Sequence, residues 1–302
     1  MTANVKLTFL GTAGSMPSAN RSPTAMLLNY KDQNILIDCG EGTQRQMRKA
    51  RLNPCKVNKI LVTHWHGDHV LGMPGLFQTL VLSGYNRKME IFGPRGTKEF
   101  LKNFVGIFVP IFKFNAESKE VSGGKVFENN DFYIEAERMK HGKALCNAYS
   151  FVIKDKIRID KAKLKKSKLP FGPLIQKLKD GKDVSYKGKK FKAKNMTYLE
   201  KGKKISFVLD TGPNSRIVPF VKGADLLVIE STMEASLEAM ANEYGHLTSK
   251  QAGEIAKKAK VGKVILTHLS PRYDMNPKII LKEAKKVFSK TSVAKDLDVV
   301  EI

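Results

Sequence analysis

Short apolar runs recur along the chain, and many of them contain β-branched residues. Runs of this kind, bounded by polar or turn-forming residues, are typical of strands. The predicted strands are Lys6–Leu10, Ala25–Leu28, Ile35–Asp38, Lys59–Thr63, Glu90–Phe92, Phe132–Ala136, Ser150–Ile153, Ile205–Leu209, Leu226–Glu230 and Val264–Thr267. Helical spacing of apolar residues lies between several of these runs. The predicted helices are Glu41–Ala50, Pro74–Ser83, Thr97–Phe104, Ser236–Met240, Thr248–Lys260 and Ile279–Phe288.

The order of these elements predicts the layers of the fold. Predicted hairpins dominate the first third of the chain, and strands alternate with helices after that. This order is typical of an α/β fold in which two sheets form the core and the helices lie outside them. The helix predicted from Thr248 has Thr248 or Ser249 as its N-cap residue.

The composition is that of a globular chain: 42% of its 302 residues are apolar and 8% aromatic, which excludes an intrinsically disordered protein. The sequence has no apolar run long enough to span a membrane, and its start lacks the apolar core of an export signal. Its three cysteines, Cys39, Cys55 and Cys146, match no metal-binding spacing and cannot all pair. We therefore expect one domain over residues 1–302, located in the reducing cytoplasm, with these thiols as small buried side chains.

The charge is strongly positive and uneven. The chain has 53 Lys and Arg against 29 Asp and Glu, a net charge of +24. Residues 154–204 contain 19 Lys and Arg against 5 Asp and Glu, so this segment alone contributes +14. Glycine and proline interrupt it, which is typical of an insertion. A solvated lysine face is one interpretation, but clustered cations favour an arm that binds the phosphates of a nucleic acid.

Within this basic segment the pattern predicts two local elements. Residues Leu174–Leu178 are expected to form a short helix, and Lys187–Lys194 part of a basic hairpin that turns near Lys187 and Gly188. Three of its lysines are candidates for contact with substrate: Lys187, Lys189 and Lys190. Three aromatic residues lie among the lysines and are equally suited to base stacking and to core packing: Tyr186, Phe191 and Tyr198.

The sharpest chemical signal is a run of four candidate metal ligands, His64, His66, Asp68 and His69, directly after an apolar strand. Side chains two positions apart in an extended segment share a face, so His64 and His66 are expected to point the same way. A tight turn at Gly67 would bring Asp68 and His69 back toward them. Imidazole and carboxylate ligands suit zinc, with manganese or iron as alternatives. A lone histidine is more often a structural residue, but four ligands this close together predict a metal site.

The three other histidines, His141, His246 and His268, each lie near the end of a predicted strand or the start of a predicted helix. Asp210 follows the apolar run Ile205–Leu209, a place where a carboxylate is costly unless it binds something. These positions are therefore further candidates for the same site.

The candidate ligands can be divided between two ions if Asp210 is shared by both. The division gives one ion the ligands His64, His66 and His141, and the other ion the ligands Asp68, His69 and His268. Two such ions lower the pKa of a bridging water and bind the attacking and leaving oxygens of a phosphoryl group, so the set favours hydrolysis. A single zinc ion is the weaker alternative, because it leaves three of these residues without a reason to converge.

This ligand series, HxHxDH followed by a distant histidine, aspartate and histidine, resembles the metallo-β-lactamase superfamily. The division of ligands given above follows that family's pattern as much as the spacing. Four further stretches resemble one of its families, tRNase Z (ribonuclease Z), the endonuclease that trims the 3′ end of precursor tRNA. These stretches are residues 9–14 with Pro17 and Arg21, residues 37–46, residues 169–179 and residues 266–273. The fold that the resemblance implies is an αββα sandwich with an inserted basic arm at about residues 154–204.

The resemblance also implies roles for single residues. Two zinc ions per subunit are implied, with Asp68 as a ligand that is also the base for the attacking water. His246 matches a histidine that is no ligand and protonates the leaving oxygen, which suits a metal-free imidazole near neutral pH. Arg272 beside His268 is a candidate phosphate contact, with a surface ion pair as the alternative. The family's flexible arm clamps the tRNA elbow, and its homodimer lets one subunit's arm serve the other's active site.

One position departs from the family pattern. Many members have His-Glu where this chain has Ile229 and Glu230, so any role of that histidine is absent or moved. Glu230 is retained and is expected to orient His246. Two rival functions remain: a phosphodiesterase or arylsulfatase of the same fold that acts on small molecules, and a non-catalytic RNA-binding protein with a structural metal. The first gives no use for the basic arm, and the second needs only four ligands.

Overall fold

The computed structural model describes residues 4–108 and 115–302. The chain divides into two compact units. We call residues 129–133 and 152–203 the arm unit, and the rest of the chain the main unit. The main unit has two seven-stranded sheets, and the arm unit has two separate two-stranded sheets.

The first sheet of the main unit has the strand order β18-β1-β2-β3-β4-β5-β6. Its strands are β1 (Lys6–Gly11), β2 (Ala25–Tyr30), β3 (Gln33–Ile37), β4 (Lys59–Leu61), β5 (Met89–Gly93), β6 (Ala116–Glu120) and β18 (Val299–Glu301). Antiparallel pairing joins β18, β1, β2 and β3, as the predicted hairpins require, and parallel pairing continues from β3 to β6. The carboxyl ends of β3 and β4 therefore lie at the same edge of this sheet.

The second sheet has the order β17-β16-β15-β14-β9-β8-β7. Its strands are β7 (Gly123–Glu128), β8 (Phe132–His141), β9 (Ala144–Ile153), β14 (Lys204–Val208), β15 (Leu226–Glu230), β16 (Lys263–Thr267) and β17 (Thr291–Val293). Parallel pairing joins β14, β15, β16 and β17, which confirms the expected strand–helix alternation in the second half of the chain. Residues that follow β14 and β16 thus emerge at one edge.

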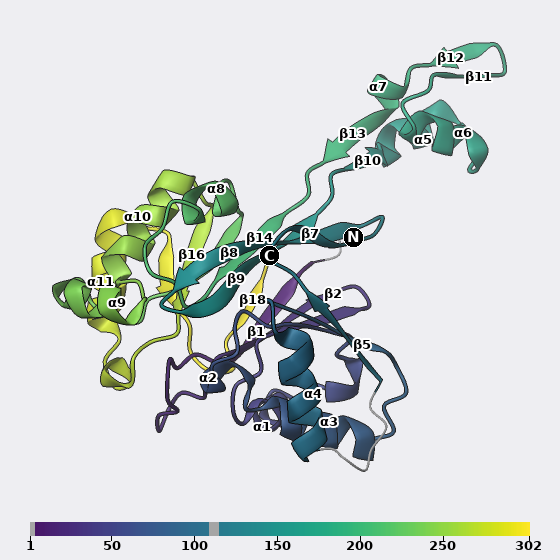
Figure 1. Ribbon diagram of the computed structural model, residues 1–302. Helices are drawn as coiled ribbons and strands as arrows, with labels where there is room; N and C mark the ends of the chain where they lie inside the picture. Colours follow the sequence, from purple (N-terminus) through teal and green to yellow (C-terminus); the bar gives the residue numbers. More distant parts are fainter. Residues whose placement is uncertain (1–3, 109–114) are drawn as a thin grey trace. The chain divides into compact units, whose positions relative to one another are not determined.

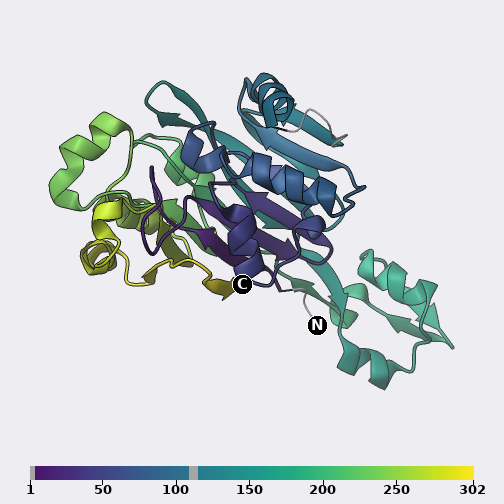
Figure 2. The same cartoon turned by 90° about the horizontal axis from the view of Figure 1, so that it is seen from below.

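The helices of the main unit are α1 (Thr43–Lys49), α2 (Gly67–Val70), α3 (Met73–Leu82), α4 (Thr97–Phe108), α8 (Ile217–Val221), α9 (Glu238–Tyr244), α10 (Ser249–Ala259) and α11 (Lys278–Val287), with 3-10 turns at Pro54–Lys56, Ala235–Leu237 and Pro271–Tyr273. Figures 1 and 2 show α1, α3 and α4 against the first sheet and α10 and α11 against the second. Along the described residues, no helix has the length and apolar character needed to cross a membrane.

Three apolar layers hold the main unit together. Buried side chains of α1 and α3 pack on the first sheet, and those of α8, α10 and α11 pack on the second. Between the sheets, the rings of Tyr30 on β2 and Phe151 on β9 lie 5.5 Å apart, and the Tyr149 hydroxyl donates to the Val62 carbonyl at 2.9 Å. The main unit is therefore the expected αββα sandwich.

The helix α10 shows how local sequence fixes a boundary. The Thr248 hydroxyl accepts a hydrogen bond from the Gln251 backbone N–H at 3.3 Å, and the Gln251 side chain accepts one from the Thr248 N–H at 2.9 Å. This capping box satisfies two backbone groups that the first helical turn leaves unpaired. Of the two residues expected as N-cap, Thr248 is the one that acts.

Four edge strands have no counterpart among the predicted strands: β6, β7, β17 and β18. The sequence of β6, Ala116–Glu120, is almost entirely polar, and most of its side chains are half-buried. An edge strand of this kind is held by backbone pairing to one neighbour and needs no apolar run. The prediction also ended β8 at Ala136, whereas the strand continues to His141 with alternate side chains buried.

The cysteines are free thiols. Cys39 and Cys146 are buried, as expected, and lie in the two apolar layers formed with the outer helices. Cys55 is half-buried, so it differs from the expectation. Burial raises the pKa of the Cys39 thiol to about 12, which keeps it protonated and unreactive.

The arm unit contains β10 (Lys156–Ile159), β11 (Val184–Tyr186), β12 (Lys189–Phe191), β13 (Thr197–Glu200), α5 (Lys161–Ser167), α6 (Pro173–Lys179) and α7 (Ala193–Met196). The predicted short helix corresponds to α6, and the predicted hairpin to β11 and β12. Its turn has positive φ at both central residues, 46° at Lys187 and 74° at Gly188, as a two-residue hairpin turn requires. The helix α5, in a lysine-rich stretch, was not predicted.

The arm unit has an apolar core of its own. Seven buried side chains form it: Leu164, Leu169, Ile175, Leu178, Val184, Ala193 and Met196. Tyr186 and Phe191 pack against this core, so these two aromatic rings have a structural role. Tyr198 on β13 is 54% exposed and stays available to a base.

Candidate metal centre

The loop between β4 and α2 presents the first four candidate ligands. His64 and His66 lie in this loop, and Asp68 and His69 lie in the single turn of α2. The expectation of a tight turn at Gly67 is therefore corrected: Gly67 begins a short helix, and His66 is its N-cap residue. The helical turn has the same consequence as the turn expected, because it brings Asp68 and His69 back toward the histidines that precede it.

Backbone contacts hold this loop in place. The Cys39 N–H donates to the His69 carbonyl at 2.7 Å, and the Gly72 N–H donates to the Cys39 carbonyl at 2.9 Å. A Cβ atom on Gly72 would lie 2.0 Å from the Gly40 carbonyl oxygen, so glycine is required for this close approach. The segment after β3 thus makes main-chain contacts that help to position α2.

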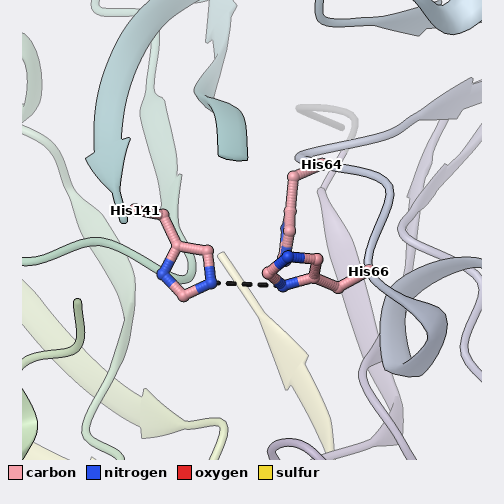
Figure 3. Close-up of side chains that lie close together, drawn as sticks. All are labelled: His64, His66 and His141. Carbon is pink, nitrogen blue, oxygen red and sulfur yellow. Dashed lines mark hydrogen bonds between the residues drawn. The ribbon is translucent and has the colours of Figure 1, made fainter. Parts of the chain in front are cut away.

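The first group of candidate ligands consists of His64, His66 and His141, whose ligand atoms lie within 4.8 Å of one another. Figure 3 shows their rings turned toward a common point, with His141 arriving from the end of β8. His66 Nδ1 lies 3.2 Å from His141 Nε2. The His141 Nδ1–H donates to the Gly245 carbonyl at 2.9 Å, which leaves the Nε2 lone pair free to bind a cation.

The second group consists of Asp68, His69, Asp210 and His268, again with ligand atoms within 4.8 Å of one another. Nε2 of His268 lies 3.0 Å from Asp210 Oδ1 and 3.4 Å from Asp68 Oδ2. His69 Nε2 lies at similar distances, 3.3 Å from Asp210 Oδ1 and 3.4 Å from Asp68 Oδ2. The sequence-predicted set is therefore brought together from residues far apart in the chain.

Asp210 lies between the two groups. Its Oδ1 faces the second group, whereas its Oδ2 lies 3.6 Å from His64 Nε2 and 3.8 Å from His141 Nε2 of the first. One carboxylate thus presents one oxygen to each group, which is the geometry that a shared ligand needs.

The donor set fits divalent metal ions. Buried polar atoms normally have hydrogen-bond partners, yet His64 Nε2 is buried and has none among the residues described. Burial holds the pKa values of His64 and His66 below their ordinary value, and neighbouring histidines lower them further. Both imidazoles are therefore neutral near pH 7, which is the form that binds metals.

Asp38 is a site residue to which the sequence analysis gave no role. Its Oδ2 lies 2.7 Å from His69 Nδ1 and accepts a hydrogen bond from the Thr63 hydroxyl at 2.8 Å, while its Oδ1 accepts from the Thr63 N–H at 2.7 Å. Burial raises the pKa of Asp38, and the contact with His69 opposes that rise. The carboxylate fixes the ring of His69 with Nε2 toward the other ligands. A carboxylate at the end of an apolar strand was the available signal, as it was for Asp210.

Replacing Asp38 with asparagine is expected to weaken divalent-metal binding by about 10- to 100-fold, because His69 loses its charged partner. Competition with a chelator of known affinity measures the change. Asp296→Asn is the matched control, since Asp296 accepts hydrogen bonds from Thr12 and Gln46 rather than from a candidate ligand. Thermal unfolding shows whether both proteins are folded. If they are, equal metal affinities for Asp38→Asn and wild type would contradict the role of Asp38 in fixing His69.

Three site residues share an uncommon backbone conformation. Asp38, Asp210 and His268 each follow a strand, and their φ angles are 55°, 45° and 56°. Positive φ is uncommon outside glycine and concentrates at functional sites. In each case it turns the side chain away from the strand direction at the edge where the ligands gather.

His246 lies beside the ligands with an acidic partner of its own. Its Nδ1 lies 3.1 Å from Glu230 Oε2 and 3.3 Å from Oε1, as expected for a carboxylate that orients it. Burial lowers the pKa of His246, but the Glu230 carboxylate outweighs this effect, so the pKa lies above its ordinary value. Glu230 Oε2 also accepts a hydrogen bond from Thr232, whose hydroxyl lies 3.0 Å from His268 Nδ1.

Four of the seven candidate ligands line an open hollow in the main unit. Among its lining residues are His66, Asp68, His141, Asp210 and His246, together with Ser15, Met233 and Tyr244. The Ser15 N–H donates to Asp68 Oδ2 at 2.8 Å and fixes that carboxylate at the mouth of the site. A ligand entering this hollow therefore meets both groups and His246.

Comparison with known proteins decides the family. A ribonuclease Z of Lactococcus lactis subsp. lactis is 37% identical over 302 residues, covering 97% of this chain and 98% of that protein. A ribonuclease Z of Methanothermobacter thermautotrophicus is 38% identical over 299 residues, covering 99% and 97%. The chain belongs to the ribonuclease Z family. It is a hydrolytic nuclease family, so a divalent metal is the expected occupant of the cluster.

Solved structures agree with this family at the level of the fold. A crystal structure of human tRNase Z, short form, has a TM-score of 0.70 at 24% identity and covers 98% of both chains. A metallo-β-lactamase fold protein from Bacillus subtilis has a TM-score of 0.72 at 22% identity, covering 99% of this chain and all of the other. A family model described as anti-Pycsar protein Apyc1 matches residues 5–163. That match ends before Asp210, His246 and His268, whereas the ribonuclease Z relatives span them. The main unit has the metallo-β-lactamase fold.

The predicted substrate contacts of this ribonuclease Z family member are exposed side chains. Arg272 lies in the 3-10 turn Pro271–Tyr273, is exposed and does not line the hollow. The three arm lysines are exposed around the β11–β12 turn. Lys187 lies over the ring of Tyr186, with 5.7 Å from Nζ to the ring centroid, and Lys190 lies 3.8 Å from Asp183.

Ile229 occupies the one position that departs from the family pattern, and the structure shows what it does there. Its side chain is fully buried in the apolar layer under α10, whereas the next residue on β15, Glu230, points the opposite way toward His246. Ile229 thus has a packing role and takes no part in the cluster.

Proposed function

We propose that this chain removes 3′ trailers from precursor tRNA by hydrolysis of a single phosphodiester bond. The products are a tRNA with a 3′-hydroxyl and a trailer with a 5′-phosphate. One observation carries the proposal: seven candidate ligands and the His246–Glu230 pair lie together in one cluster, in a chain aligned over almost its whole length with ribonuclease Z proteins.

Two zinc ions, or alternatively manganese or iron, complete the site in this proposal. His64, His66 and His141 would hold one ion, Asp68, His69 and His268 would hold the other, and Asp210 would be a ligand of both. When bound, such ions lower the pKa of water toward neutrality and neutralise charge on a phosphoryl group. The distances of Asp210 to both groups and the unpartnered His64 Nε2 support two ions rather than one.

Asp68 and His246 move the protons of the reaction. The Asp68 carboxylate, oriented by the Ser15 N–H, takes a proton from the attacking water, whose oxygen forms the new bond to phosphorus. The bond from phosphorus to the 3′-oxygen of the tRNA breaks, and that oxygen takes a proton from His246. Because Glu230 engages His246 Nδ1, the proton on Nε2 is the one available for this transfer.

The RNA body is bound through its phosphates. The arm unit, with Lys187, Lys189 and Lys190 at its hairpin turn, supplies sequence-independent contacts, and Arg272 supplies one more on the main unit. These contacts would recognise the shape and the backbone of the RNA rather than its base sequence. The homodimer and the cytoplasmic location that the family resemblance implies belong to this proposal, and light scattering of the purified protein tests the first.

Cleavage of a precursor tRNA with a 3′ extension tests the function. Purified wild type is expected to cut at one position near the discriminator base with zinc or manganese, and His66→Ala to leave the RNA uncut. Deletion of residues 158–200 is expected to raise KM more than it lowers kcat and to weaken the dependence of binding on salt, because clustered cations are lost.

A triple replacement of Lys187, Lys189 and Lys190 with alanine narrows this test to the hairpin turn. Its control is Lys285→Ala with Lys286→Ala, which removes exposed lysines from α11. If wild type binds the RNA but leaves it intact with both metals, the enzyme assignment fails and the arm belongs to a binding protein.

A further inference from the structure

A second hollow of the main unit meets the metal-ligand hollow at His141, which lines both. It is formed by the end of β8, the β8–β9 turn and the loop that follows β14. Four cations line it: Arg138, Lys140, Lys143 and Arg216. We call these four residues and the hollow between them the basic groove. Because the basic groove borders the metal-ligand hollow, its positive charges act on any anion that approaches the candidate ligands.

The alternation of β8 places these cations. Met139 and His141 are buried on the face toward the core and the ligands, whereas Arg138 and Lys140 are exposed on the other face. Lys143 follows in the turn to β9 and is exposed as well. The same strand end thus carries a candidate metal ligand on one face and two cations on the other.

The charge of the basic groove is poorly compensated. Glu137 Oε1 lies 3.7 Å from Arg216 Nη1, but Arg138, Lys140 and Lys143 have no acidic partner among the residues that the structure describes. An exposed lysine face needs no hollow. A hollow that is lined by cations and shares His141 with the metal-ligand hollow suits further phosphates of a strand bound at the ligands.

The chemistry at His246 gives the direction of that strand. His246 protonates the 3′-oxygen that stays on the tRNA, so the last tRNA nucleotide lies on its side, in the part of the hollow lined by Met233 and Tyr244. Tyr244 is 59% exposed and offers a ring to a base. We assign the strand beyond the scissile phosphate to the second hollow, which is reached at His141 because this residue lines both hollows. We propose, on the basis of the proposed function, that the basic groove binds the backbone phosphates of the 3′ trailer.

Two precursors that differ only in trailer length, one nucleotide and about ten nucleotides, test this proposal. For the double variant Arg138→Ala with Lys143→Ala, KM for the long-trailer precursor is expected to rise roughly tenfold, and KM for the short-trailer precursor less than about twofold. The slope of log affinity against log salt for the long-trailer precursor is expected to fall by about 0.7 for each cation removed. The ratio of the two KM values is the readout.

The double variant Lys285→Ala with Lys286→Ala is the matched control, because it removes the same number of exposed cations from the main unit outside the groove. An equal rise in KM for both precursors would overturn the trailer assignment, and so would an unchanged KM for the long one. Failure of wild type to cut either precursor would instead overturn the proposed function, so the two failures are distinguishable.

Discussion

Replacing Asp210 with asparagine is expected to lower kcat for precursor cleavage by at least about 100-fold and to reduce the number of bound divalent ions. The reason is geometric: Asp210 Oδ1 lies 3.0 Å from His268 Nε2, and Oδ2 lies 3.6 Å from His64 Nε2. An amide has one weak oxygen ligand and one NH₂ group that repels a cation, so a single substitution affects both groups of ligands. Metal analysis of the protein after gel filtration gives the ion count, and kcat is measured with saturating metal.

The control for this variant is again Asp296→Asn, which removes a carboxylate outside the cluster. Thermal unfolding of both variants shows whether the fold is retained. If Asp210→Asn binds as many ions as wild type and its kcat stays within about threefold, Asp210 is not the shared ligand, and the two groups act separately or only one of them binds metal.

Replacing His246 with glutamine is expected to lower kcat by about 10²- to 10⁴-fold while metal content stays that of wild type, because a general acid is lost and no ligand is removed. A substrate with sulfur in place of the leaving 3′-oxygen separates this role from others. A thiolate leaves without a proton, so the variant and wild type should cut that substrate at similar rates.

Glu230→Gln is the companion variant. It keeps a hydrogen-bond partner near His246 Nδ1 but removes the charge that raises the pKa of the imidazole, so the alkaline limit of the pH–rate profile should move to lower pH.

The sulfur substrate also gives the outcome that would contradict the proton-donor role. A His246→Gln defect that persists in full with that substrate would show that His246 positions the RNA rather than donating a proton.

The candidate ligands could be read from the sequence because their chemistry is conspicuous. Four ligands in six residues after an apolar strand have few structural explanations, and Asp210 ends an apolar run where a carboxylate is costly. Parallel pairing of β14, β15 and β16 then brings the residues after β14 and β16 to one edge. Long-range convergence thus follows from strand order, which the sequence predicts only in outline.

Other features of the site and the fold depend on contacts that the pattern of residues along the sequence does not predict. Asp38 lies in a motif that was recognised, yet its role depends on the distance to His69, which strand pairing sets. The helical turn at Gly67 was predicted as a tight turn because four residues are too few to show helical spacing. The edge strand Ala116–Glu120 is held by backbone pairing rather than by apolar burial, so its sequence resembles a loop.

The separate core of the arm unit bears on how this protein can evolve. The seven buried side chains around Leu178 belong to the arm unit alone, and no residue of the main unit's apolar layers is among them. The arm can therefore open or refold locally without exposing the core beneath the metal ligands. Mutations that change its charge or length carry little stability cost for the catalytic fold. Under the proposed function, selection can thus alter which RNAs the arm binds while the residues that break the bond stay constant.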